Sequence, residues 1–424
     1  MDDYGGKFDP EFHPAKLSRR GLAVLGREYM LICHLQDRSG LPQVMGRFGA
    51  DEMRLIAIDE WMAASPTYTK RMQRALGFPG EDVATIFKGI QFDVGAPHQF
   101  LDFQMRVTDA NHGEFWLAHC GALMDVEPMG EEHVRGMCHQ IEDPTFDATA
   151  VATNPRARMR PIHRPPRVPA DRMPHCHWNV TIEPENEPVE EIDLARVVRR
   201  SRLASLEIPE TASTEPGGLS DYSGPFDPGM QLEDLAHPAL VRVGQEFCLQ
   251  GHLLVRALML AVAQRHGDEA AIPIAASQWV GIAGVGAERI VRAMKIGGDG
   301  PEAIAKLLQI HSAFMPRAYI DLHVALDGDT VRCWIGDCEA FAEKDPYSWL
   351  ALPEGDLHRA VEAMARVVNP RARVRGCSVP GARVAWEVEI DPDAQPSREP
   401  PEVKLTKFSS GAAFQFAERR PLRV

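Results

Sequence analysis

The stretch DYSGPFDP, Asp221–Pro228, decides how this chain is organised, because the chain opens with nearly the same residues, DYGGKFDP at Asp3–Pro10. Taken alone, the stretch is rich in Gly, Pro, Ser and Asp and is typical of a surface loop. At the same offset of 218 residues, GREYMLICHL (Gly26–Leu35) falls on GQEFCLQGHL (Gly244–Leu253). The chain is therefore a tandem duplication, and the quoted stretch begins the second copy.

The match continues through the second half of each copy. EFWLAHCGAL (Glu114–Leu123) falls on RCWIGDCEAF (Arg332–Phe341), and NPRARMR (Asn154–Arg160) falls on NPRARVR (Asn369–Arg375). The period is far longer than that of solenoid repeats, so each copy is a whole domain. The predicted division is a first repeat at 1–195 that carries the site, a linker at 196–218, a second, degenerate repeat at 219–395 and an extended tail at 396–424.

Composition narrows the class of protein. Of the 424 residues, 44% are hydrophobic and 25% are charged, as in ordinary soluble proteins, and the net charge of −14 disfavours a nucleic-acid partner. The most apolar run, HLLVRALMLAVAQ, is too short to span a membrane and contains Arg256. The acidic start does not resemble a signal peptide, and eight cysteines without small-scaffold spacing favour reduced thiols. We therefore expect a cytoplasmic protein with no membrane partner.

The hydrophobic pattern of each copy predicts an α+β fold. Apolar residues at helical spacing fill the front of copy one, and two β-like runs then flank a hairpin turn at Asp109–Gly113. A short helix and two more strands follow, so each domain should have a helical front and a small antiparallel sheet with one packed helix. The expected helices cover 15–36, 50–65, 81–93 and 130–143, and the last two strands 157–163 and 176–183.

The second copy serves as an internal control for function. Positions that both copies keep, such as Glu28 and Glu246 or His34 and His252, are expected to serve the fold, whereas residues found only in copy one are candidates for chemistry. Thiols and imidazoles gather in the last third of copy one, and these residue types suit Zn, Fe or Cu. The candidate ligands of one transition metal ion, Zn or Fe, are Cys138, His139, His175, His177, Cys120, Cys176 and His163.

Strand alternation limits which of these residues could bind together. It places His175 and His177 on one face of the last strand and Cys176 on the other. Glu142 and Asp143 are candidates for moving protons, and His119 is a third catalytic candidate. No pair has the spacing of a structural zinc finger, so each residue could also be buried filler or polar surface.

Arginines crowd the same segment of an acidic chain. Arg164, Arg167 and Arg172 are the candidates for binding an anionic substrate, because guanidinium groups match carboxylates. The alternative is that they form salt bridges with the protein's own acidic surface.

This order of motifs resembles a known family. A cysteine after a hairpin, a Gly-led helix with a second cysteine, an Asn-Pro strand and a last strand with a third cysteine are similar to the L-2-amino-thiazoline-4-carboxylic acid hydrolase-like family. The resemblance implies hydrolytic opening of a small ring that contains a C–N bond. This chain departs from the family's pattern in being duplicated and in having a histidine beside each cysteine. The residues that carry the resemblance are Cys120, Gly130, Cys138, Asn154, Pro155 and Cys176.

The sequence thus predicts a metal-dependent hydrolase that acts on a small, anionic organic molecule. The alternatives are a non-haem iron oxidase or oxygenase, a non-catalytic protein that binds a metal or small ligand, and an enzyme that uses Cys138 or Cys120 as a nucleophile without metal. The two copies are expected to pair as an internal pseudo-dimer, and a homo-oligomer remains open.

Overall fold

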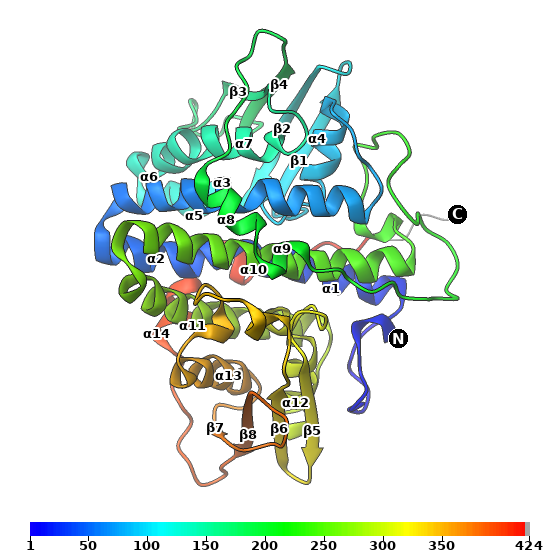
Figure 1. The fold of residues 1–424 in the computed structure, drawn as a ribbon, viewed down its shortest axis with the longest axis vertical. Helices are drawn as coiled ribbons and strands as arrows, with labels where there is room; N and C mark the ends of the chain where they lie inside the picture. The colour runs from blue at the N-terminus through cyan, green and yellow to red at the C-terminus, as the bar shows by residue number, and fades with distance from the viewer. Residues whose placement is uncertain (420–424) are drawn as a thin grey trace.

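A computed structural model describes residues 1–419 and places two antiparallel four-stranded sheets at opposite ends of a layer of long helices (Figure 1). The predicted α+β class and the two similar domains are confirmed. The strands run in the orders β1-β2-β4-β3 and β5-β6-β8-β7, so the two sheets share one topology. The strands are β1 (Leu101–Val107), β2 (His112–Cys120), β3 (Ala157–His163), β4 (Cys176–Ile182), β5 (Leu322–Asp327), β6 (Thr330–Ile335), β7 (Ala372–Gly376) and β8 (Val384–Ile390).

The helical front differs between the copies at one point. Copy two has a single unbroken helix α10, whereas copy one breaks at Leu35 into α1 and α2. Ser18 caps the start of α1 by accepting a hydrogen bond from the Gly21 N–H at 3.2 Å. The front helices are α1 (Arg19–His34), α2 (Gln36–Phe48), α3 (Ala50–Ala75) and α4 (Val83–Ile90) in copy one, and α10 (His237–His266), α11 (Asp268–Ala293) and α12 (Pro301–Ile310) in copy two.

Two of these helices, α10 and α11, are long and apolar enough to cross a membrane. Their apolar windows are 94% and 78% buried inside the molecule, as expected of core helices in a soluble protein. Their composition therefore reflects packing between the two copies.

The two copies interlock through reciprocal contacts. Helix α3 packs along α10, and α11 packs along α1 and α2. Arg71 on α3 forms a buried ion pair with Glu246 at 2.8 Å, and its counterpart Arg289 forms one with Glu28 at 2.7 Å. Each contact thus occurs twice with the roles of the copies exchanged, and the core belongs to both copies.

The repeated DYxGxFDP segments are arms that each copy lends to the other. In the first arm, the Tyr4 hydroxyl donates to Gln309 of copy two at 2.7 Å. In the second arm, the Tyr222 hydroxyl donates to Gln91 of copy one at 3.0 Å. The DYxGxFDP segment therefore recurs because each arm makes the same kind of contact, a hydrogen bond from its tyrosine to a glutamine of the other copy.

The helix predicted at 130–143 is more elaborate than its sequence suggests. It consists of α6 (Glu131–Arg135), a π-helical turn at Gly136–Ile141, and α7 (Glu142–Val151), and a further short helix, α5 (Gly121–Val126), precedes it. In copy two the single helix α13 (Glu354–Val368) takes this place. π-helical turns often occur at functional sites because the extra residue shifts the side chains of the helix that follows.

The predicted linker and tail both contain packed helices. Helices α8 (Asp193–Arg199) and α9 (Arg202–Ser205) lie in and beside 196–218, and α14 (Pro401–Thr406) shows that the tail at 396–424 is not extended throughout. Residues 420–424 of that predicted tail lie outside the described residues. The proline content misleads here, because Pro401 stands at the first position of α14, where proline favours a helix start.

Candidate functional site

A cavity of about 150 Å³ lies in copy one, between the front helices, the sheet and α7. A cavity of this size has room for a ring molecule such as benzene. Its walls are largely apolar, with a few polar side chains that converge from different elements. The polar lining consists of His34, Asp37, Arg38, Trp61, Asp93, Cys120, Glu142, Thr145 and Thr149.

Copy two has closed the equivalent space. The ring of Trp349 stacks on Trp279 with 5.5 Å between ring centres, and it lies 5.8 Å from the ring of His252. Trp61, the counterpart of Trp279, instead lines the open cavity and donates a hydrogen bond to Asp37 at 2.8 Å. The cavity is therefore a feature of copy one that copy two has filled.

Buried acids distinguish the open cavity from the closed one. Asp37 and Asp93 line it, and Glu60 lies fully buried behind Asp37. A buried carboxyl group is costly unless it has a partner or a task, so three of them in one place make this cavity the candidate functional site. At the matched positions, copy two has Val255, Gln278 and His311.

Asp93 is held in place by two donors. Its carboxylate accepts hydrogen bonds from the Tyr68 hydroxyl at 3.0 Å and from the Gly95 N–H at 2.7 Å. Burial raises the pKa of Asp93 to about 6, and the two hydrogen bonds oppose that rise. Asp93 is therefore mostly ionised at neutral pH.

Asp37 and Glu60 form a coupled pair of carboxyl groups. Burial raises the pKa of both groups, and the charge of Asp37 raises the pKa of Glu60 further, well above its ordinary value. Two adjacent carboxylates in a buried site cannot both be charged without a large cost, so at least one of the two holds a proton at neutral pH.

Glu142 also lines the cavity, from the first position of α7, directly after the π-helical turn. Burial raises the pKa of its carboxyl group to about 8, although the nearby Arg164 opposes that rise. Glu142 is therefore mostly protonated at neutral pH and can donate a proton into the cavity. Glu142 and Asp93 thus line one cavity with pKa values on opposite sides of neutrality.

The three cysteines of the family resemblance gather near Glu142. Burial raises the pKa of Cys120 to about 12, and the charge of Glu142 contributes to this rise. Burial also raises the pKa of Cys138 and Cys176 well above the ordinary value, with smaller contributions from Glu142 and the Cys120 thiol. All three side chains are protonated thiols at neutral pH, which disfavours any of them as a nucleophile without an activating group.

His34 and Arg38 complete the polar lining of the cavity. Burial lowers the pKa of His34 to about 3, so the ring is neutral, and neither ring nitrogen has a hydrogen-bond partner within the described residues. The charge of Arg38 is balanced by the fully buried Asp125, at 3.2 Å. Asp125 also accepts hydrogen bonds from Ser409 at 2.6 Å and from the Ser410 N–H at 2.8 Å, so the C-terminal segment helps to fix this wall.

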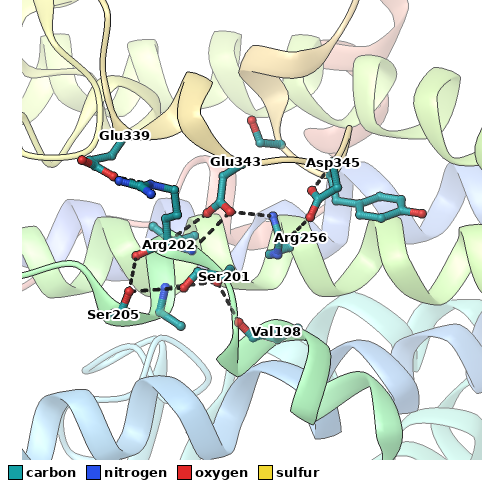
Figure 2. A network of polar contacts seen from close by, with 12 residues as sticks. Val198, Ser201, Arg202, Ser205, Arg256, Glu339, Glu343 and Asp345 are labelled. Atoms are coloured by element: carbon teal, nitrogen blue, oxygen red, sulfur yellow. Dashed lines mark hydrogen bonds and ion pairs between the residues drawn. The ribbon is translucent and has the colours of Figure 1, made fainter.

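Copy two repeats this last arrangement beside its closed cavity (Figure 2). Glu343, the counterpart of Asp125, accepts a hydrogen bond from the Leu203 N–H at 2.9 Å and lies 3.8 Å from Arg256. Asp345 is a second ion-pair partner of Arg256. In both copies, then, an acid near the cavity pairs with an arginine and accepts hydrogen bonds from the last segment of the other copy. Because both copies have this arrangement, we assign it to the fold.

The three predicted substrate arginines do not line the cavity. Arg164 forms an ion pair with Asp143 and lies over the ring of Trp178, 5.8 Å from its centre. Arg167 donates two hydrogen bonds to Glu127, at 3.0 and 2.8 Å, and Arg172 is exposed. Arg164 and Arg167 thus form salt bridges with the protein's own acids, which was the alternative to binding an anionic substrate.

The predicted histidine ligands are spread over several places. His139 is hydrogen-bonded to the Pro165 carbonyl at 2.7 Å. His177 pairs with Glu114 at 2.9 Å, and its ring centre is 6.1 Å from that of His163.

Cys176 and His177 point to opposite faces of β4, as strand alternation predicted: Cys176 is buried with Trp178, and His177 is partly exposed. His175, which precedes the strand, lies with its ring centre 6.1 Å from that of His119, which packs on Phe414.

Among residues 1–419, no group of three or more His, Cys, Asp or Glu side chains is placed to hold a metal ion.

Sequence analysis assigned His34 to the fold, because both copies keep it, and did not single out Asp37 or Asp93. A signal was present, since Asp37 and Asp93 stand where copy two has Val255 and His311. The prediction rested on thiols and imidazoles, which suit transition metals, and not on the carboxylates of the helical front.

Comparison with known proteins adds no further constraint: no family model, no curated protein and no solved structure matches the chain. The resemblance to the thiazoline carboxylic acid hydrolase-like family stays a prediction.

Proposed function

We propose that the chain is an enzyme that hydrolyses a C–N or related bond of a small organic molecule in the cavity of copy one. The observation that carries this proposal is the pair Glu142 and Asp93, two carboxyl groups on one cavity whose pKa values of about 8 and about 6 differ in the sense that acid–base catalysis needs. That copy two has closed the equivalent space supports a single site per chain.

The proposed reaction adds water across the bond that breaks. Asp93, as the carboxylate, takes a proton from a water molecule whose oxygen bonds to the substrate carbon. The C–N bond then breaks, and the nitrogen leaves with the proton of Glu142. Proton exchange with solvent restores both groups, so the net change is the consumption of one water molecule.

The lining of the cavity favours a neutral or nitrogen-basic substrate. Asp37 and Asp93 supply acceptors, whereas the charge of Arg38 is already balanced by Asp125. The apolar walls and Trp61 suit a flat ring, and a ring nitrogen that carries hydrogen would find acceptors. This differs from the anionic substrate that the arginine cluster suggested.

The pH profile of kcat/KM tests the two assignments. Below a pH of about 6 Asp93 is protonated and cannot accept a proton, and above about 8 Glu142 is ionised and cannot donate one. We therefore expect a bell-shaped profile with its maximum between these values, measured by ring opening of small cyclic amidines, lactams and 2-amino-thiazoline-4-carboxylate. Turnover that keeps rising with pH would contradict the role of Glu142.

A second candidate function uses a metal, and one observation favours it. Glu142 and the thiols of Cys120, Cys138 and Cys176 lie close enough to affect one another's pKa, and thiolates with a carboxylate suit Zn or Fe. Within the described residues they are not placed as a ligand set, so an ion would have to draw them together. Binding would have to displace the thiol protons, and the ion could then activate the attacking water.

Elemental analysis of the purified protein separates the two candidates. About one Zn or Fe per chain, lost in Cys138→Ala/Cys176→Ala but kept in His177→Ala, would assign the metal to the thiols. His177 is the matched control because it lies on the other face of β4 and pairs with Glu114. Equal metal content in all three proteins would reject this ligand set.

Two other outcomes remain within the same site. Oxygen consumption that requires iron would indicate a non-haem iron oxidase or oxygenase, and a tight complex without turnover would indicate a binding protein. A cytoplasmic location stays part of the proposal, supported by eight free cysteines.

A further inference from the structure

A second pocket, of about 650 Å³, lies on the outer flank of copy one. It is bounded by one face of α3, the end of α7, the segment 189–191 and α8. None of its lining residues lines the catalytic cavity. Pockets of this size accommodate ligands as large as a phosphorylated sugar.

Four cationic side chains line this pocket in a chain of net charge −14. Arg196 pairs with Asp193, and Arg199 pairs with Glu191. Lys70 and Arg74 form no ion pair within residues 1–419, and the Lys70 ammonium group donates only to the Gln73 amide, at 3.1 Å. Glu190 also lines the pocket and forms no ion pair within the described residues, so Lys70 and Arg74 together exceed it by one positive charge.

At the equivalent position in copy two, the positive charge is neutralised by ion pairs. The residue that matches Lys70 is Glu288, which forms an ion pair at 2.6 Å with Lys407, the counterpart of Arg199. Lys407 also pairs with Glu399, just as Arg199 pairs with Glu191. In copy one the matched position holds Lys70 in place of the acid, so this ion pair cannot form there.

A buried threonine also lines this pocket. Thr67 lines it and is only 6% exposed, yet its Oγ1 atom has no hydrogen-bond partner within the described residues. Buried hydroxyl groups normally have one. The Oγ1 atom itself is covered by protein atoms, so it would reach a ligand only after a rotation of the Thr67 side chain. Copy two has Val285 at the matched position, which has no hydroxyl to satisfy.

We propose that this pocket binds a small anion of phosphate chemistry, either free phosphate or the phosphate group of a metabolite. Arginine and lysine together supply the fork of donors and the point charge that phosphate oxygens accept, and a threonine hydroxyl adds a further donor. The site is independent of the proposed hydrolysis, because it shares no residue with the catalytic cavity.

Isothermal titration of the full chain tests the proposal with two probes, inorganic phosphate and glucose 6-phosphate, in chloride buffer of constant ionic strength. We expect saturable binding of at least one probe that weakens by more than about tenfold in Lys70→Glu, because an acid would then face the anion. Thr67→Val should weaken binding less. Tighter binding of glucose 6-phosphate would identify a phosphate ester as the ligand, and tighter binding of phosphate the free ion.

Lys404→Glu is the matched control, since Lys404 is the copy-two counterpart of Arg196 on α14 and the variant makes the same change of charge. It should bind as the parent protein does, and so should Glu142→Gln. The proposal is overturned if neither probe binds, or if Lys70→Glu and Lys404→Glu affect binding equally.

Discussion

Replacing Glu142 by Gln is expected to lower kcat by about 10²- to 10⁴-fold, the usual contribution of a general acid. Glutamine has nearly the same shape, but its amide cannot give a proton to the leaving nitrogen. KM should change little, because the lining that binds the ring is kept. The measurement is the initial rate of ring opening near neutral pH, on whichever cyclic substrate the parent protein turns over.

The pH dependence of stability separates this loss of chemistry from damage to the fold. The folded state raises the pKa of Glu142 from 4.5 to about 8, so the parent protein loses stability as the pH rises between these values, and the glutamine variant does not. The variant should therefore be at least as stable as the parent above that pH. Glu132→Gln on α6 is the matched control, because the Glu132 side chain is 78% exposed, and it should retain full activity. Equal rates in the parent and in Glu142→Gln would refute the assignment.

Replacing Arg289 by Met is expected to destabilise the chain by about 3–5 kcal/mol, the usual effect of removing one partner of a buried ion pair. Arg289 is fully buried, and its loss leaves Glu28 without its counter-ion between the two copies. Burial already raises the pKa of Glu28, so its carboxyl group should take up a proton in the variant. Arg71→Met should act in the same way through Glu246. Urea unfolding gives the free energies.

Two further variants test whether the pair itself is responsible. Glu28→Gln/Arg289→Met removes both charges and should recover part of the loss. Arg373→Met removes an ion pair with Asp391 whose arginine is 64% exposed, and should cost less than about 1 kcal/mol. If Arg289→Met were no more harmful than Arg373→Met, the copies would not depend on this contact.

The sequence predicted the architecture well because internal repetition and hydrophobic period are long-range signals. It indicated the hairpin at Asp109–Gly113, the two later strands of copy one and the similarity of the two domains, but not the order of the strands within each sheet. It could not indicate that the arm at Asp3–Pro10 packs on the other copy. The repeated sequence would be the same whether each arm contacted its own copy or the other one. The π-helical turn at Gly136–Ile141 was also beyond reach, because no local residue pattern specifies it.

The site was predicted in part. Glu142 was chosen for its helix and lies on the cavity, and Cys120, Cys138 and Cys176 gather near it. The histidines were grouped by closeness in sequence, but His139 bonds the Pro165 carbonyl and His177 pairs with Glu114, so neighbouring positions do not bring their rings to one point. The closing of copy two by Trp349 could not be anticipated, because that residue begins a short helical turn in a segment that folds differently from the matched segment of copy one.

The exchanged arms have a consequence for how such a protein can change. In a dimer of identical chains every substitution appears in both halves, so a tryptophan that blocks one cavity would block both. Joining the halves in one polypeptide removes that constraint, and here one half has kept an open cavity while the other has become a support. Because Tyr4 and Tyr222 each bond the other half, neither half could be transferred alone into another protein without losing the arm that packs on it.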